Sequence, residues 1–113
     1  MSLTIYLTNE TCPHCGHGDE VFDCNITHNL SKMADEAGLY YQLWRPKECG
    51  IETAGQLIEP ITDAIDKMRL EPERFRALDS PNGWGTYGGF IMWLERLLAA
   101  CVDNPKATVR ANR

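Results

Sequence analysis

The sequence of 113 residues lacks a long hydrophobic run and has no excess of basic residues. No apolar stretch approaches the roughly 18 residues that a membrane-spanning helix needs, so we expect no membrane span. The first residues, Met1 to Thr8, show neither a charged leader nor a long apolar segment, so we also expect no secretory signal. The net charge of −5 argues against non-specific binding to nucleic acid, which requires a basic surface.

The composition is that of one ordinary globular domain. Apolar residues make up 43% of the chain and charged residues 24%, which fits neither a disordered nor a fibrous protein. The length is close to the commonest domain size, so we predict a single domain over residues 1–113. Five cysteines, an odd number, fit a reducing compartment and metal binding better than a disulfide framework. We therefore expect a cytoplasmic location.

The pattern of apolar residues predicts an α+β fold in which helix dominates. Alternation of Leu3, Ile5 and Leu7 with polar residues predicts a first strand. Helical spacing then predicts a helix from Ile26 that stops at Gly38, with its N-cap at residue 23 or 25. The remaining elements are a helical turn at 39–44, a helix from 53 kinked or divided at Pro60, a short helix from Pro72, a helix from about 90 to 102 and a strand at 107–111.

We expect the two terminal strands of this fold to pair with each other. A two-stranded ribbon alone is only marginally stable, so three or four helices should pack on one of its faces and supply most of the core. The segment before the first predicted helix is rich in turn residues and contains the first two cysteines.

The most specific motif is Cys12-Pro-His-Cys15, followed by a cysteine and a histidine. Thiolates and neutral imidazole are the ligands that Zn²⁺ prefers, and four of them close a tetrahedral structural site. We therefore predict a zinc-binding segment at about residues 12–28, with Cys12, Cys15, Cys24 and His28 as ligands, while His14 and His17 compete for the histidine position. If Cys24 lies in the helix with His28, the two side chains stack one turn apart on one face; if it precedes the helix, it can still approach the metal.

Three other interpretations of these cysteines stay open. If Cys24 does not bind, Cys12, Cys15 and His28 leave an open coordination position, as in catalytic zinc sites. Cys-Pro-His-Cys is also the type of sequence seen in disulfide oxidoreductases, although glycines follow it here instead of a long helix. Finally, Cys12 and Cys15 can be plain loop thiols and Cys24 a small buried hydrophobe.

The polar residues around His28 form a second candidate site. Asn25, Asn29 and the intervening threonine are mediocre helix formers, so their concentration calls for a reason. They either cap the helix and support a metal-binding histidine, or line a polar pocket that faces a ligand.

A glycine-rich loop before the last predicted helix is a third candidate. Backbone amides at a helix N-terminus can hold an anion, and the aromatic residues of the loop can stack on a planar ring. Alternatively, the glycines only allow a tight connection and both aromatics cover the core. The loop also matches G-x-G-x-x-G, but no strand precedes it, so the dinucleotide-binding interpretation is weak. The candidate ligand-binding residues of this loop are Asn82, Gly83, Trp84, Gly85 and Tyr87.

Four stretches carry a resemblance to a known group of proteins: Asn25-Ile-Thr-His-Asn-Leu30, Leu43-Trp-Arg-Pro46, Leu57-Ile-Glu-Pro60 and Asn82-Gly-Trp-Gly85. Together they resemble a family of small uncharacterised proteins encoded by bacteriophages and prophages. The likeness covers roughly residues 21–113, and similar members also contain the Cys-Pro-His-Cys stretch. The resemblance implies an accessory phage protein in the cytoplasm of a bacterial host, and it implies no activity.

Two classes of function follow from these observations. The first is a non-enzymatic zinc-binding protein that binds a host protein or a small ligand, for example to antagonise host defence, through the Trp84 loop and the polar stretch. The second is a small metal-dependent hydrolase with an open zinc site at Cys12, Cys15 and His28. A zinc-finger nucleic-acid binder is a third alternative that the acidic charge disfavours. The sequence identifies neither the partner nor the oligomeric state.

Overall fold

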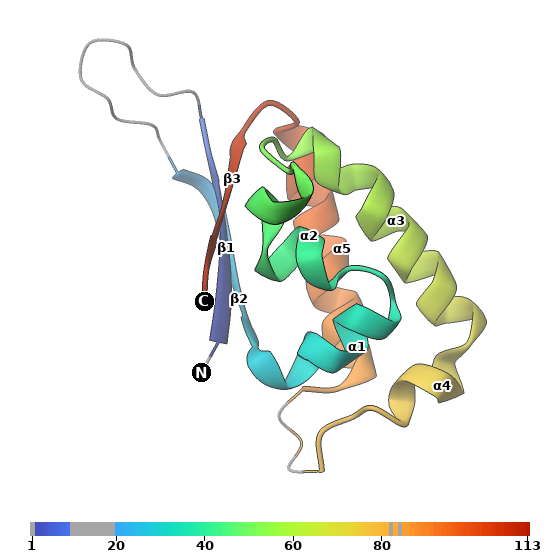
Figure 1. Ribbon diagram of the computed structural model, residues 1–113. Coiled ribbons are helices and arrows are strands. Elements are labelled where there is room, and N and C mark those ends of the chain that lie inside the picture. Colours follow the sequence, from blue (N-terminus) through green and yellow to red (C-terminus); the bar gives the residue numbers. More distant parts are fainter. Residues whose placement is uncertain (1, 10–19, 82, 84) are drawn as a thin grey trace, which may run out of the picture.

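A computed structural model describes residues 2–9, 20–81, 83 and 85–113. These residues form a three-stranded antiparallel sheet with helices on one of its faces (Figure 1). The strands are β1 (Ser2–Thr8), β2 (Glu20–Thr27) and β3 (Thr108–Asn112), in the order β2-β1-β3. The predicted α+β class and the pairing of the two terminal strands, β1 and β3, are confirmed.

The central strand β1 determines which face of the sheet is covered. Its apolar residues Leu3, Ile5 and Leu7 are fully buried, while the polar residues between them are only half-buried. In the two ladders, Ile5 lies opposite Cys24 of β2 and Ala111 of β3. Since side chains alternate between the faces of a strand, the inner face of all three strands is apolar and the outer face is polar.

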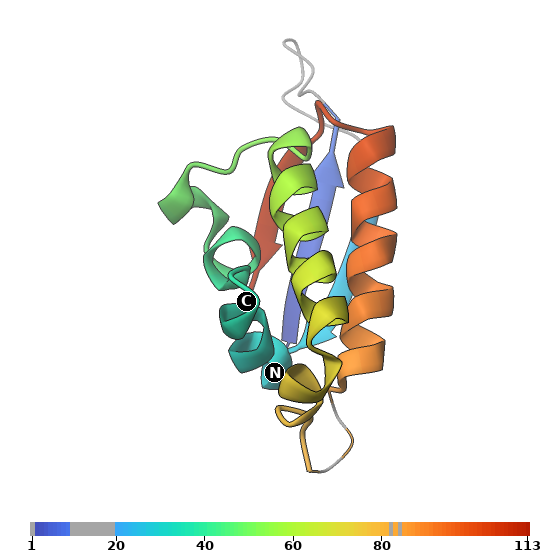
Figure 2. The same cartoon turned by 90° about the vertical axis from the view of Figure 1, so that its right-hand side faces the viewer.

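Helices fill the other side of the core. The two long helices, α3 and α5, lie side by side over the sheet, and the shorter elements flank them (Figure 2). No helix in the described part of the chain is both long and apolar enough to cross a membrane. The helical elements are η1 (His28–Leu30), α1 (Ser31–Glu36), α2 (Tyr40–Trp44), η2 (Pro46–Cys49), α3 (Gly55–Leu70), α4 (Pro72–Arg76) and α5 (Tyr87–Asp103).

The predicted helix start at Ile26 is wrong. Residues 20–27 form β2 instead, because Phe22, Cys24 and Ile26 alternate with polar residues and their side chains turn toward the core. The helical spacing holds only from Leu30 onward, where η1 leads into α1. The predicted stop at Gly38 is confirmed, since this residue has φ +77°, a conformation that glycine adopts at little cost.

Pro60 does not divide the second long helical segment into two. It is inside the continuous helix α3, where its missing N–H removes one hydrogen bond to a preceding carbonyl. The buried residues Leu57 and Ile61 on either side keep this helix packed on the core. The predicted helical turn at 39–44, the short helix at Pro72 and the final strand are confirmed as α2, α4 and β3.

Candidate ligand-binding groove

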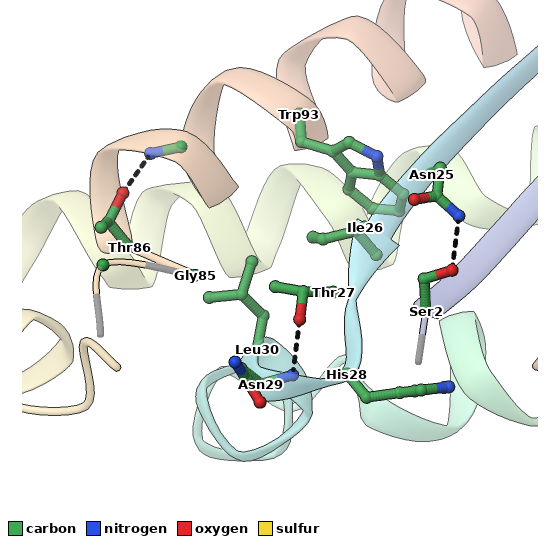
Figure 3. A pocket seen from close by; sticks show the side chains of 12 residues that line it. Ser2, Asn25, Ile26, Thr27, His28, Asn29, Leu30, Gly85, Thr86 and Trp93 are labelled. Atoms are coloured by element: carbon green, nitrogen blue, oxygen red, sulfur yellow. Dashed lines mark hydrogen bonds between the residues drawn. The ribbon is translucent and has the colours of Figure 1, made fainter. Parts of the chain in front are cut away.

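A groove of about 940 Å³ lies where the end of β2 and η1 meet the start of α5 (Figure 3). It brings together two of the predicted sites, the polar stretch around His28 and the glycine-rich loop, which are more than fifty residues apart in the sequence. No Asp, Glu, Lys or Arg is among the described residues that line it. These residues are Ser2, Asn25, Ile26, Thr27, His28, Asn29, Leu30, Gly83, Gly85, Thr86, Gly89 and Trp93.

At Gly85 the loop packs tightly against η1 and the residue before it. A Cβ atom at this position would lie 3.1 Å from Leu30 Cγ and 3.1 Å from Thr27 Cγ2. The residue also has φ +108°, which side-chain-bearing residues rarely adopt. Both the backbone conformation and the lack of space therefore require glycine here, and Gly85 is part of the groove lining.

The loop ends at Thr86, the N-cap of α5, and the helix begins at Tyr87, three residues earlier than the sequence predicted. Thr86 is extended, and its hydroxyl oxygen accepts a hydrogen bond from the Gly89 N–H at 3.2 Å, as an N-cap residue does. Tyr87, a predicted ligand-binding residue, is nine-tenths buried, and its hydroxyl donates to the Met68 carbonyl at 3.0 Å. Tyr87 thus packs in the core and does not line the groove. Asn82 and Trp84 lie outside the described residues.

The hydrogen bond between Trp44 and His28 determines the chemistry of the histidine. The indole N–H of Trp44 donates to Nδ1 of His28 at 2.9 Å. Because Nδ1 accepts, the neutral imidazole carries its proton on Nε2 and presents a donor there. Trp44 is itself 3% exposed and stacks on Tyr40 with ring centroids 5.6 Å apart. This packing holds the Trp44 ring in place, and with it the hydrogen bond to His28.

Asn25 presents an acceptor on the same groove. Its Nδ2 donates to Ser2 Oγ at 2.9 Å and to Thr4 Oγ1 at 2.8 Å. These bonds orient the side-chain amide and leave Oδ1 to accept a further hydrogen bond. Asn29 is positioned through its backbone N–H, which donates to Thr27 Oγ1 at 3.2 Å.

Trp93 of α5 also lines the groove, next to Ile26 of β2 (Figure 3). It is 7% exposed, and its indole Nε1 is buried without a hydrogen-bond partner among the residues that the structure describes. An unpaired buried donor costs roughly 1–3 kcal/mol. A ligand acceptor or a water molecule that reaches this nitrogen would recover that free energy.

The predicted zinc ligands Cys24 and His28 do not share a site in this structure. Extended chain from one to the other places their Cα atoms about 13 Å apart, which is farther than a cysteine and a histidine side chain can together span when both bind one zinc ion at about 2.0–2.3 Å. Of the two arrangements considered from the sequence, the one in which they stack on one helix face is wrong, because Cys24 lies in β2. In addition, a metal-binding histidine normally donates a hydrogen bond from its second nitrogen, while Nδ1 of His28 accepts a hydrogen bond from Trp44.

The Cys24 thiol is part of the core. It is 5% exposed on the inner face of β2, near Cys101 of α5. Burial raises the pKa of Cys24 from 9.0 to about 12, and burial likewise raises the pKa of Cys101 to about 12.

Cys12, Cys15 and the two competing histidines lie outside the described residues. The described residues that flank this segment, Asn9 and Glu20, are at the opposite end of the β1–β2 hairpin from His28. Within residues 2–9, 20–81, 83 and 85–113, no group of three or more His, Cys, Asp or Glu side chains is arranged to hold a metal ion. Zinc binding at Cys12 and Cys15, and the identity of the remaining ligands, stay predictions.

Several residues of the groove were missed in the sequence. Trp44, which holds His28, stood out only in a predicted helical turn and in the stretch Leu43-Trp-Arg-Pro46, and the polar roles of Ser2 and Thr86 had no distinctive spacing. Trp93 offered one usable signal: it is a tryptophan within an apolar helix, and a buried indole N–H normally needs a partner. For Ser2 and Thr86, only the pairing of β1 with β2 and the contact at Gly85 bring the side chains to the site.

Comparison of the chain with models of protein families, with curated proteins and with solved structures found no match.

Gly85→Ala should destabilise the protein by about 2 kcal/mol, because the new Cβ meets Leu30 and Thr27 and the backbone is strained at positive φ. Urea unfolding followed by circular dichroism measures this loss. Gly88→Ala is the matched control: nothing lies within 4 Å of its Cβ and its φ is not in the positive region, so it should be neutral or stabilising. Equal effects of the two substitutions would show that Gly85 is not a tight contact.

The buried thiols predict a loss of stability at alkaline pH. A thiol that ionises near pH 9 when unfolded and near pH 12 when folded contributes its full stability below pH 9 and loses it as the pH rises toward 12. The free energy of unfolding should fall by up to about 1.4 kcal/mol per pH unit for each thiol. Urea unfolding between pH 8 and pH 11 should therefore show a shallower decline for Cys24→Ala than for the wild type; parallel declines would contradict the assignment.

Cys24→Ala and His28→Gln should leave the zinc content of the purified protein unchanged, because neither side chain fits a shared metal site. Elemental analysis by mass spectrometry gives this content directly. Cys12→Ala combined with Cys15→Ala is the comparison, and it should remove any zinc that the wild type carries. A loss of zinc in either of the first two variants would restore those residues as ligands.

Proposed function

We propose that this protein is a non-enzymatic binding protein whose groove holds an uncharged polar ligand. The observation that carries the proposal is the convergence of the Asn25–Asn29 stretch with Gly83 and Gly85 on a groove that has no Asp, Glu, Lys or Arg among its described lining residues. Ligand sites are typically concave, largely apolar and supplied with a few well-placed polar groups. This groove has that composition.

The chemistry of the lining indicates the ligand. The Nε2–H of His28 is a donor and Oδ1 of Asn25 is an acceptor, so a ligand with both a carbonyl and an N–H or hydroxyl group fits them. Ile26, Leu30 and Trp93 add an apolar surface. A charged ligand would lose hydration here without gaining a counter-charge, which favours a neutral one.

The alternative of a metal-dependent hydrolase has less support. A catalytic zinc ion needs three protein ligands and an open position, and the predicted set was Cys12, Cys15 and His28. Because the Nδ1 of His28 is occupied by Trp44, this residue is a hydrogen-bond donor at its remaining nitrogen. Zinc held by Cys12 and Cys15 with other ligands is retained as a separate proposal, with a structural role.

The resemblance to proteins encoded by bacteriophages and prophages adds a context to the proposal. A phage accessory protein in the bacterial cytoplasm would take a molecule of the host as its ligand, either a small molecule or part of a host protein. Antagonism of a host defence component is one activity that requires binding alone, with no chemical step.

A titration followed by ¹H–¹⁵N correlation spectra tests the groove. The full-length protein is titrated to millimolar concentrations with N-acetylglycine amide, uridine and N-acetylglucosamine, three neutral compounds that carry both donors and acceptors. We expect at least one of them to shift the amide signals of Thr27, Asn29 and Gly85. Absence of localised shifts with all three probes would overturn the proposal.

Trp44→Phe tests the role of the histidine in this binding. The substitution keeps an aromatic ring but removes the N–H that holds Nδ1 of His28, so binding of the active probe should weaken by about fivefold, as expected for roughly 1 kcal/mol. The ¹⁵N shifts of the imidazole report the change of tautomer directly. Tyr41→Phe on the same helix is the control, because Tyr41 is exposed and does not line the groove. Equal weakening in both variants would contradict the role of His28.

A further inference from the structure

The two edges of the sheet differ in how they are covered. β3 is capped by residues 52–54: the Val109 N–H donates to the Glu52 carbonyl at 2.9 Å, and the Ala54 N–H donates to the Ala107 carbonyl at 2.9 Å. β2 forms the opposite edge (Figure 2), and within the described residues no backbone hydrogen bond joins it to any strand or loop except β1. Every second residue of β2 therefore directs its N–H and C=O groups away from the sheet.

The protection of this edge is uneven along its length. Proteins usually place charged residues, bulges or proline on exposed edges to prevent pairing with another chain. The first half of β2 has Glu20 and Asp23 and a register shift beside it. The second half, Cys24 to Thr27, has no charged residue and leads directly into the groove. The unprotected part of the edge and the groove are thus one continuous surface.

The charges at the far end of this surface indicate what lies against it. Glu20 and Asp23 are both exposed, and no ion pair of either is found in the described part of the chain. Some loss of hydration and the neighbouring Asp23 carboxylate raise the pKa of Glu20. A cation beside the two carboxylates would relieve this repulsion.

A second copy of the chain is a poorer occupant than a basic segment. Each copy has a net charge of −5, and pairing β2 with its own copy would gather two sets of Glu20 and Asp23 at one interface. Like charges on paired strands are destabilising. A segment that carries lysine or arginine meets these carboxylates with the opposite charge.

We propose that the outer edge of β2 binds an extended, basic segment of a partner polypeptide, which adds to the sheet as a fourth strand. Its basic residue lies beside Glu20 and Asp23, and its uncharged part follows the edge into the groove. Gly85, packed against Thr27, stops the added strand at that end. The inference rests on the proposed function of the groove and identifies its ligand as peptide backbone, which offers alternating neutral donors and acceptors.

Peptide titrations of the full-length protein test this pairing. The probes are acetyl-Lys-Lys-Val-Thr-Val-Thr-amide and acetyl-Val-Thr-Val-Thr-Lys-Lys-amide, which suit the two possible strand directions. Each is compared, by ¹H–¹⁵N correlation spectra, with the same sequence that has glutamate in place of both lysines. We expect the lysine peptide of one direction to bind at least tenfold more tightly than its glutamate form and to shift amide signals from Glu20 to Ile26. In Asp23→Lys the preference should fall or reverse, whereas Asp66→Lys, an exposed change of the same charge on α3, should leave it intact. Equal binding of the lysine and glutamate forms in both directions, or equal effects of both variants, would overturn the inference.

N-methylation separates strand pairing from simple charge attraction. One form of the tighter-binding lysine peptide carries N-methyl groups on both valines and a second form carries them on both threonines. Only one of these alternating sets of amides faces β2, so one peptide should lose binding by more than tenfold and the other should retain it. Any other pattern would contradict pairing along the edge.

Two further outcomes show which part of the proposal is wrong. If the small neutral probes shift Thr27 and Gly85 but both lysine peptides leave Glu20 to Ile26 unaffected, the groove stands as a ligand site and the strand addition is wrong. If the free protein self-associates with rising concentration and the same β2 signals shift, the edge belongs to a second copy and the inference is overturned.

Discussion

The burial of Leu3, Ile5 and Leu7 on one face of β1 is the interaction on which the rest of the structure depends. β1 is the central strand, so this apolar row determines which face of β2 and β3 turns inward and where α3 and α5 pack. A shift of the strand by one residue would turn all three side chains to solvent, which makes the register strongly specified. Ser2 at the start of the strand then lies beside the end of β2.

The groove is a consequence of this register combined with two specific contacts. β2 ends at Thr27 and η1 follows directly, and the hydrogen bond from Trp44 holds His28, the first residue of η1, in one tautomer. The tight packing of Gly85 brings the start of α5 against the same turn. Neither contact contributes a large hydrophobic area, but together they place donors and acceptors from separate elements on one surface, which no single element offers.

The sequence predicted elements well where a single periodicity was present. The alternation in β1, the helical faces of α3 and α5, and the glycine stop at Gly38 are local signals that tertiary contacts reinforced. The prediction from sequence failed at residues 20–27, where two patterns overlap. Ile26 belongs to the helical series that continues through Leu30, and also to the alternating series of Phe22 and Cys24. Pairing with β1 decided between them, and that information is not in the segment itself.

The sequence by itself determined the α+β class, the apolar faces and the concentration of polar residues at Asn25 to Asn29, because each follows from residue type and spacing within one segment. Only the tertiary structure decided that Cys24 is a core thiol, that His28 is a donor held by Trp44, and that the glycine-rich loop closes against η1. These roles depend on which residues from distant segments come within hydrogen-bonding or van der Waals distance. That proximity is set by the packing of the whole sheet and its helices, and it separated Cys24 from His28 by the extended chain of β2.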